Sequence, residues 1–185
     1  MTTDEAARLV AETLAAERIP NIIVGGCSSN TYGIPRATKD VDVVVSVAAA
    51  RLTDLLNRLG PAWKHDLQLS FETNTGTTRE IFELKGTPLK VELFSLSQDE
   101  HDQARFTRRA RQQMSGIPVW MPTAEDVVVW KLRWARPKDI EDIRNVLPMQ
   151  SREGRLDWNY MREWCAKHGP LARLEEIVAG LPKPK

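Results

Sequence analysis

Asp40 and Asp42 stand two residues apart in a valine-rich stretch, with Val41 between them. Valine favours strands, and residues two apart on a strand project from the same face. Two neighbouring carboxylates repel each other. Mg²⁺ resolves this repulsion because it prefers oxygen ligands, commonly one or two carboxylates plus phosphate oxygens. The pair therefore predicts a metal site for phosphoryl transfer, although an isolated Asp-x-Asp triplet can also be a solvated strand edge.

A glycine pair, Gly25-Gly26, follows a short apolar run that reads as a buried strand. A turn without side chains lets backbone N–H groups approach a phosphate. Either Ser28 or Ser29 can add a hydroxyl donor, and the guanidinium of Arg36 can neutralise phosphate charge as a fork. The combination of the apolar run, the two glycines, an arginine and Asp-x-Asp is more specific than any of its parts.

A further acid stands in a strand candidate later in the chain. In the segment 89–94, alternation places Lys90, Glu92 and Phe94 on one face. An acid in this frame suits a metal ligand or a general base for an incoming hydroxyl. Glu83 is the alternative, because it is framed in the same way by Phe82 and Leu84.

The segment 24–45 resembles the signature of the DNA polymerase β-like nucleotidyltransferase superfamily, a Gly-[Gly/Ser] turn followed by Asp-x-Asp. The amino-acid sequence of this segment is most similar to the small bacterial branch of the superfamily that contains AbiE-type and MenT-type toxins. A second pattern, running from Pro122 to Asp142 with Lys131 inside it, is similar to the helical motif of that branch. The resemblance covers about residues 20–147.

The resemblance implies roles for several residues. Asp40, Asp42 and Glu92 would bind the metal, Mg²⁺ or Mn²⁺, although the family usually has Asp at the third position. Lys131 would contact the triphosphate, with Asp139 or Asp142 orienting it. The residues expected to bind nucleotide are Gly25, Gly26, Ser28, Arg36, Lys131 and Asp139.

The implied reaction transfers NMP from an NTP, such as ATP, to an acceptor hydroxyl. The resemblance points to tRNA or a protein as acceptor, and to a toxin with an antitoxin protein as partner. Two alternatives stay open. One is an antibiotic nucleotidyltransferase of the aminoglycoside type, and the other is a nucleotide-binding module without turnover.

Several of the candidate residues can also be explained by ordinary structural roles. Lys131 can be a snorkelling lysine. Lys138, Asp139 and Asp142 are expected at an exposed helix start, where Lys138 and Asp142 have the spacing of a surface pair. A basic cluster comprises Arg105, Arg108, Arg109 and Arg111. It is expected either to be a solvated face or to bind the phosphates of an RNA backbone. Cys27 is expected to be a small buried residue rather than a nucleophile.

The whole-chain composition is neutral and ordinary. The 185 residues carry a formal net charge of +1, so any basic surface must be local. The two cysteines, Cys27 and Cys165, give no disulfide scaffold or zinc pattern. No signal peptide or membrane-spanning apolar run is visible, which predicts a cytoplasmic protein without membrane contact.

The hydrophobic pattern predicts an α/β (α+β) fold, in which a small mixed β-sheet is flanked by helices, and the resemblance implies that this sheet is a nucleotidyltransferase core. Two domains are expected: a core at 1–118, and a helical region at 119–185 that completes the active-site cleft. A helix capped by Thr2 and Glu5 should precede the first strand. Further strands are expected at 41–45, 67–73, 79–85 and 89–94, and helices at 48–59, from Thr123, from Pro137, at 157–168 and at 171–180. For residues 27–33 the pattern allows either a short helix or an irregular loop.

Overall fold

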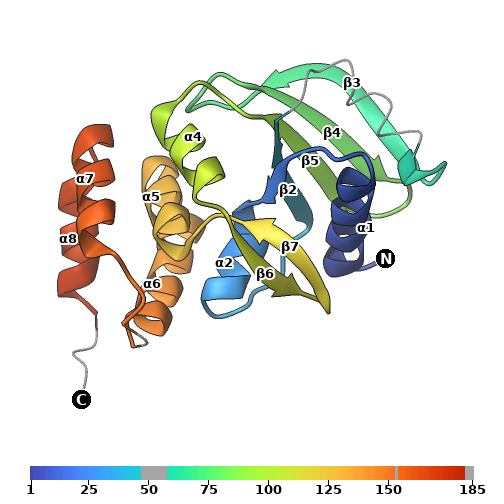
Figure 1. Cartoon of the computed structure of the whole chain (residues 1–185). Coiled ribbons are helices and arrows are strands. Elements are labelled where there is room, and N and C mark those ends of the chain that lie inside the picture. The colour runs from blue at the N-terminus through green and yellow to red at the C-terminus, as the bar shows by residue number, and fades with distance from the viewer. Residues whose placement is uncertain (47–57, 153, 182–185) are drawn as a thin grey trace. The chain divides into compact units, whose positions relative to one another are not determined.

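The computed structural model describes residues 1–46, 58–152 and 154–181 (Figure 1). The chain forms two compact units. The first comprises Met1–Cys27 and Ala37–Pro122, and the second comprises Ser28–Arg36 and Thr123–Lys185. The transition between them falls inside helix α2 (Gly25–Tyr32). The expected domain division at residue 118 stays a prediction, and the helix expected at 48–59 lies almost entirely outside the described residues.

The first unit is built on a mixed five-stranded sheet, which confirms the predicted fold class. The strand order is β1-β2-β5-β4-β3. Strands β2 and β5 run parallel, whereas each of the other neighbouring pairs is antiparallel. The bounds are Asn21–Ile23 for β1, Asp40–Val45 for β2, Trp63–Phe71 for β3, Thr78–Leu84 for β4 and Lys90–Ser95 for β5.

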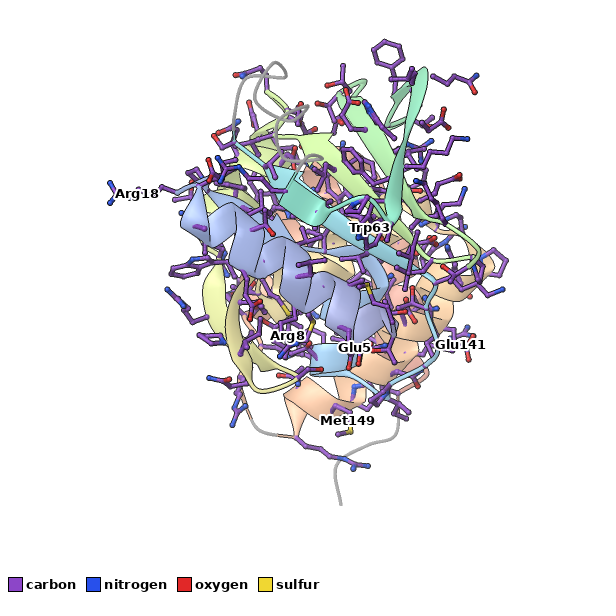
Figure 2. All side chains as sticks on the ribbon, turned by 90° about the vertical axis from the view of Figure 1, so that its right-hand side faces the viewer. Glu5, Arg8, Arg18, Trp63, Glu141 and Met149 are labelled. Atoms are coloured by element: carbon purple, nitrogen blue, oxygen red, sulfur yellow. The ribbon has the colours of Figure 1, made fainter. Side chains whose placement is uncertain are left out.

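Helix α1 (Thr3–Ala16) packs against one face of this sheet. Its start is confirmed, because the side chains of Thr2 and Glu5 form the expected capping box. Ala6, Val10 and Leu14 recur at helical spacing and are fully buried. They meet every second residue of the strands, including Val41, Val43, Val45, Val91, Leu93 and Phe82. Figure 2 shows the outer side of α1, with Glu5, Arg8 and Arg18 labelled.

The opposite face of the sheet carries the alternate residues and a smaller apolar cluster. That cluster contains Ile22, Val24, Val44 and Phe106, with Phe94, Leu96 and Trp120 packed against it. Phe106 comes from helix α4 (Glu100–Thr107), and Trp120 from the hairpin of β6 (Ala110–Met114) and β7 (Ile117–Met121). Strand β7 lies beside β1 (Figure 1).

The second unit is helical apart from its loops. Its helices are the later part of α2, α5 (Ala124–Trp134), α6 (Pro137–Ser151), α7 (Trp158–His168) and α8 (Leu171–Ala179). Thr123 caps α5 and Pro137 opens α6, as the sequence predicts. Its core is apolar and includes Tyr32, Val128, Leu132, Ile143, Leu147, Met161 and Leu174. No helix among the described residues is long and apolar enough to cross a membrane.

Candidate active site

The pairing of β2 with β5 sets two of the predicted acids directly opposite each other. Asp42 is the Cα partner of Glu92, and Asp40 is the Cα partner of Lys90. Neighbouring strands lie about 4.8 Å apart, and paired residues share a face of the sheet. Asp40, Asp42 and Glu92 therefore project from one face of the first unit, opposite to the face that packs on α1.

Gly25 is adapted to the carboxylate of Asp42. The Val24 amide donates to the Asp42 carbonyl at 2.8 Å, which brings the start of α2 beside β2. Gly25 has a φ of +63°, and a Cβ built on it would lie 1.8 Å from Asp42 Oδ2. Only glycine fits this position, because a side chain would displace the carboxylate. The glycine pair therefore opens a helix, where the sequence predicts a simple turn.

Thr38 supports the other aspartate and was not singled out in the sequence. The Thr38 hydroxyl donates to the Asp40 carbonyl at 3.2 Å, and the Asp40 amide donates to Thr38 Oγ1 at 3.4 Å. The Thr3 hydroxyl donates to the Thr38 carbonyl at 2.6 Å. A Cβ on Gly26 would lie 3.0 Å from Thr38 Oγ1. The glycine pair thus accommodates both sides of the Asp-x-Asp segment.

Arg79 on β4 forms an ion pair with Glu92, the proposed third acid. Arg79 was not singled out in the sequence. Its Nη1 lies 3.1 Å from Glu92 Oε2, and its Nε donates to Ser70 Oγ at 3.1 Å. The alternative acid, Glu83, has a different partner, because Lys90 Nζ lies 2.9 Å from Glu83 Oε1. Glu92 is thus the acid in register with Asp42, whereas Glu83 stands opposite Lys90.

Carboxylates on this face of the sheet influence the pKa values of two neighbouring side chains, Cys27 and Lys90. Burial raises the pKa of the Cys27 thiol to about 12, and the negative charges of Asp42, Asp4 and Asp40 add to the shift. The hydrogen bond with Glu83 raises the pKa of Lys90, with further contributions from Glu92 and Asp40. The Asp40 carboxylate therefore contributes to the pKa shifts of both Cys27 and Lys90. A protonated, buried Cys27 agrees with the expectation that it is no nucleophile.

The donor set suits a hard divalent cation held in part by its substrate. Asp40 and Asp42 offer carboxylate oxygens from one strand, and the missing Cβ of Gly25 leaves room for the Asp42 carboxylate. Mg²⁺ commonly takes one or two carboxylates plus phosphate oxygens. Within residues 1–46, 58–152 and 154–181, no cluster of three or more His, Cys, Asp or Glu residues is arranged as a complete metal site. The two aspartates fit the metal, and the role of Glu92 as a third ligand stays a prediction.

In the second unit, Lys131 and Arg36 converge on Asp142. Lys131 Nζ lies 2.6 Å from Asp142 Oδ2 and 3.3 Å from Asp139 Oδ1. Arg36 grips Asp142 as a fork, with Nε at 2.6 Å from Oδ1 and Nη2 at 2.9 Å from Oδ2. Arg136 pairs with Asp139 at 2.6 Å. The expectation of an exposed helix start is wrong for Asp139 and Asp142, which are 1% and 3% exposed.

This network holds Asp142 in its ionised form. Burial would raise the pKa of Asp142, but hydrogen bonds from Arg36 and Lys131 outweigh it, and the pKa lies below its ordinary value. The hydrogen bond to Asp142 raises the pKa of Arg36. The expected triphosphate contacts of Arg36, Lys131 and Asp139 stay predictions, as does that of Ser28, which is buried in α2.

The basic cluster does not form a uniform solvated face. Arg105 is buried and pairs with Asp102 at 2.6 Å. Arg109 and Arg111 instead lie over aromatic rings. The sequence interpretation missed this separation, although Asp102 stands three residues before Arg105 and offers it a partner.

Comparisons with known proteins agree with this fold. Residues 1–176 match the family described as "Nucleotidyltransferase of unknown function (DUF6036)", and the chain belongs to this nucleotidyltransferase family. No curated protein matches the chain. The predicted superfamily is therefore confirmed, whereas the closer kinship with AbiE-type and MenT-type toxins is not.

Several solved structures share the fold. ANT(2'')-Ia in complex with adenylyl-2''-tobramycin superposes with a TM-score of 0.61 at 14% identity, covering 89% of this chain and 95% of that one. An antigenic nucleotidyltransferase-like protein from Paracoccidioides brasiliensis gives 0.60 at 18% identity, covering 98% and 94%. JHP933 from Helicobacter pylori gives 0.54 at 13% identity, covering 95% and 75%. At these identities the likeness concerns the fold.

Proposed function

We propose that this protein transfers NMP from an NTP to an acceptor hydroxyl in a metal-dependent reaction. The observation that carries the proposal is the placement of Asp42 opposite Glu92 on adjacent parallel strands, with Asp40 on the same face. In the reaction the acceptor oxygen forms a bond to the α-phosphorus, and the bond from that phosphorus to pyrophosphate breaks. The acceptor proton leaves to a base, so that NTP and alcohol yield the nucleotidylated product and pyrophosphate.

Asp40 and Asp42 are the proposed ligands of Mg²⁺ or Mn²⁺. When bound, such an ion polarises phosphate oxygens and lowers the pKa of a coordinated hydroxyl. Gly25 and Gly26 serve the same site by leaving room for the Asp42 carboxylate and for Thr38. The backbone N–H groups at the start of α2 favour negative charge nearby, as helix N-termini do.

Glu92 is the proposed acceptor of the hydroxyl proton. Arg79 holds its Oε2, which fixes the orientation of the carboxylate. Oε1 makes no hydrogen bond within the part of the chain that the structure describes, so one oxygen is available to take the proton. A general base of this kind contributes about 10²–10⁴-fold to a rate.

The proposed acceptor is tRNA or a protein side chain, and the protein is proposed to be the toxin of a toxin–antitoxin pair. Both proposals rest on the resemblance of segments 24–45 and 122–142 to such toxins. A second candidate is an antibiotic nucleotidyltransferase. This candidate is favoured by the fold shared with ANT(2'')-Ia, because the similarity extends over 95% of that chain. The solved structure of ANT(2'')-Ia is a complex with adenylyl-2''-tobramycin.

One labelling experiment separates these candidates. The full chain is incubated with Mg²⁺, each α-³²P-labelled NTP in turn, and total RNA, lysate protein or tobramycin. Label in RNA or protein supports the toxin-type acceptors, and label in tobramycin supports the antibiotic enzyme. Asp42→Asn should abolish labelling. Mg²⁺-dependent NTP binding without label or pyrophosphate release in any reaction would contradict the proposed transfer.

A further inference from the structure

Two arginines of the first unit lie over one tryptophan at the β6–β7 hairpin. The Arg111 Cζ lies 4.8 Å from the centre of the Trp120 ring, and the Arg109 Cζ lies 5.3 Å from the same ring. Arg109 also covers the ring of Phe106 at 4.6 Å. The three residues Arg109, Arg111 and Trp120 are called the Arg–Trp stack below. Stacking on a ring fixes the plane of a guanidinium.

No carboxylate among the residues that the structure describes pairs with the arginines of the Arg–Trp stack. Neither Arg109 nor Arg111 forms an ion pair in the described parts of the chain, in contrast to Arg105. Arg109 donates from Nη1 to the Phe106 carbonyl at 2.6 Å, and its buried Nε has no acceptor among the described residues. Arg111 is exposed. Two guanidinium groups that have no carboxylate partner among the described residues therefore share one small area of a nearly neutral protein.

The Arg–Trp stack is on the same face of the sheet as the proposed catalytic acids. Trp120 and Phe94 both pack against the cluster that contains Val44. Val44 follows Asp42 by two residues on β2, and Phe94 follows Glu92 by two residues on β5. Two residues of strand span roughly 7 Å. The acids therefore lie beside the apolar cluster on which Trp120 packs, so an extended chain along this face would pass both the acids and the Arg–Trp stack.

We propose that the Arg–Trp stack binds the phosphodiester backbone of an RNA acceptor. This inference rests on the proposed function and selects RNA among its acceptors. A stacked guanidinium keeps its in-plane N–H groups directed outward, where they match phosphate oxygens. A basic surface that follows the backbone is one of the means by which proteins hold single-stranded nucleic acid without sequence preference. The net charge of +1 makes such a local patch necessary for RNA binding.

The test is direct binding of a fluorescein-labelled single-stranded RNA to the full chain, measured by anisotropy without NTP. Arg111→Ala is the main variant because Arg111 is exposed and its loss leaves the core intact. Arg8→Ala is the matched control: Arg8 is exposed on α1, which packs on the opposite face of the sheet (Figure 2). Both variants remove one positive charge.

Arg111→Ala should weaken RNA binding about fivefold and reduce the slope of log K against log salt by roughly 0.7, the value for one phosphate contact on a single strand. Arg8→Ala should bind as the wild type does. The inference fails if the wild type does not bind RNA, if Arg111→Ala binds as tightly as the wild type, or if both variants lose affinity equally. Because no turnover is needed, RNA binding that Arg111→Ala weakens, in a protein that releases no pyrophosphate, would contradict the proposed function but not the binding of RNA by the Arg–Trp stack.

Discussion

The Asp42 carboxylate occupies the space that a side chain on Gly25 would need, with Oδ2 only 1.8 Å from the position of a Cβ. The two residues come from different elements, α2 and β2, and their approach leaves no room for a larger residue at position 25. Gly25 also has a φ of +63°, a region that L-residues enter at a cost of about 1–2 kcal/mol.

Gly25→Ala should therefore reduce NMP transfer about 100-fold, because displacing a catalytic group by about 1 Å has this effect. Gly76→Ala is the matched control. Its φ is +66°, but nothing lies within 4 Å of the added Cβ, so it carries the backbone cost alone. Urea unfolding and labelling rates measured on both variants separate strain from the clash. Equal activity of the two variants would argue against a role for the Gly25–Asp42 approach.

Glu92→Gln should lower the turnover rate by about 10²-fold or more, as expected for loss of a general base. Glu83→Gln changes a nearby acid, paired with Lys90, and should leave the rate within a few-fold of wild type. Steady-state labelling gives both rates. A larger loss in Glu83→Gln would assign the third acid to Glu83.

Asp142→Ala should lower the free energy of unfolding by about 3 kcal/mol or more, because it leaves Arg36 and Lys131 as cations without their shared carboxylate. Glu175→Ala is the control at an exposed ion pair, where Arg162 is the partner, and should change stability little. Urea unfolding followed by circular dichroism gives both values. Similar losses would show that the buried network adds nothing beyond a surface pair.

The contribution of Asp142 should depend on pH in a defined direction. Its folded-state pKa is depressed, so the stabilisation is complete above the unfolded-state pKa of about 3.9 and is lost as pH falls through the folded-state value. The difference in unfolding free energy between wild type and Asp142→Asn should be constant at neutral pH and shrink below about pH 4. A difference that grows on acidification would contradict the assignment.

Both cysteines should be unreactive in the native state. Burial raises the pKa of Cys27 and of Cys165 to about 12, and only the thiolate reacts. Ellman's reagent at about pH 8 should titrate neither thiol in the folded protein and both in urea. Rapid native labelling of one thiol, located by peptide mapping, would overturn the placement of that cysteine.

The sequence predicts best what depends on neighbours along the chain. The cap at Thr2, the cap at Thr123 and the proline at the start of α6 are local signals, and each marks a helix where expected. The Asp-x-Asp strand is also predicted, because alternation within one strand decides which side chains share a face.

Features that need distant partners could not be predicted. The parallel register that sets Asp42 opposite Glu92 joins strands separated by a long stretch of chain, and nothing in either strand specifies it. Asp142 looks like a surface acid until Arg36, 106 residues away, is brought to it. Strands β6 and β7 were missed because one is rich in Arg and Gln and the other contains Pro118; the signal was the Ser115–Gly116 turn, where both φ values are positive.

The short segment Ser28–Arg36 has a consequence for dividing the chain into fragments. This segment lies early in the sequence but belongs to the helical unit, where Gln150 donates to the Tyr32 carbonyl and Gly33 packs against Val146. A fragment ending at Pro122 would leave Tyr32 without its core, and one beginning at Thr123 would lack Arg36, the partner of Asp142. We therefore expect neither half to be expressed well alone, so that the two fragments must be produced together to recover a folded protein.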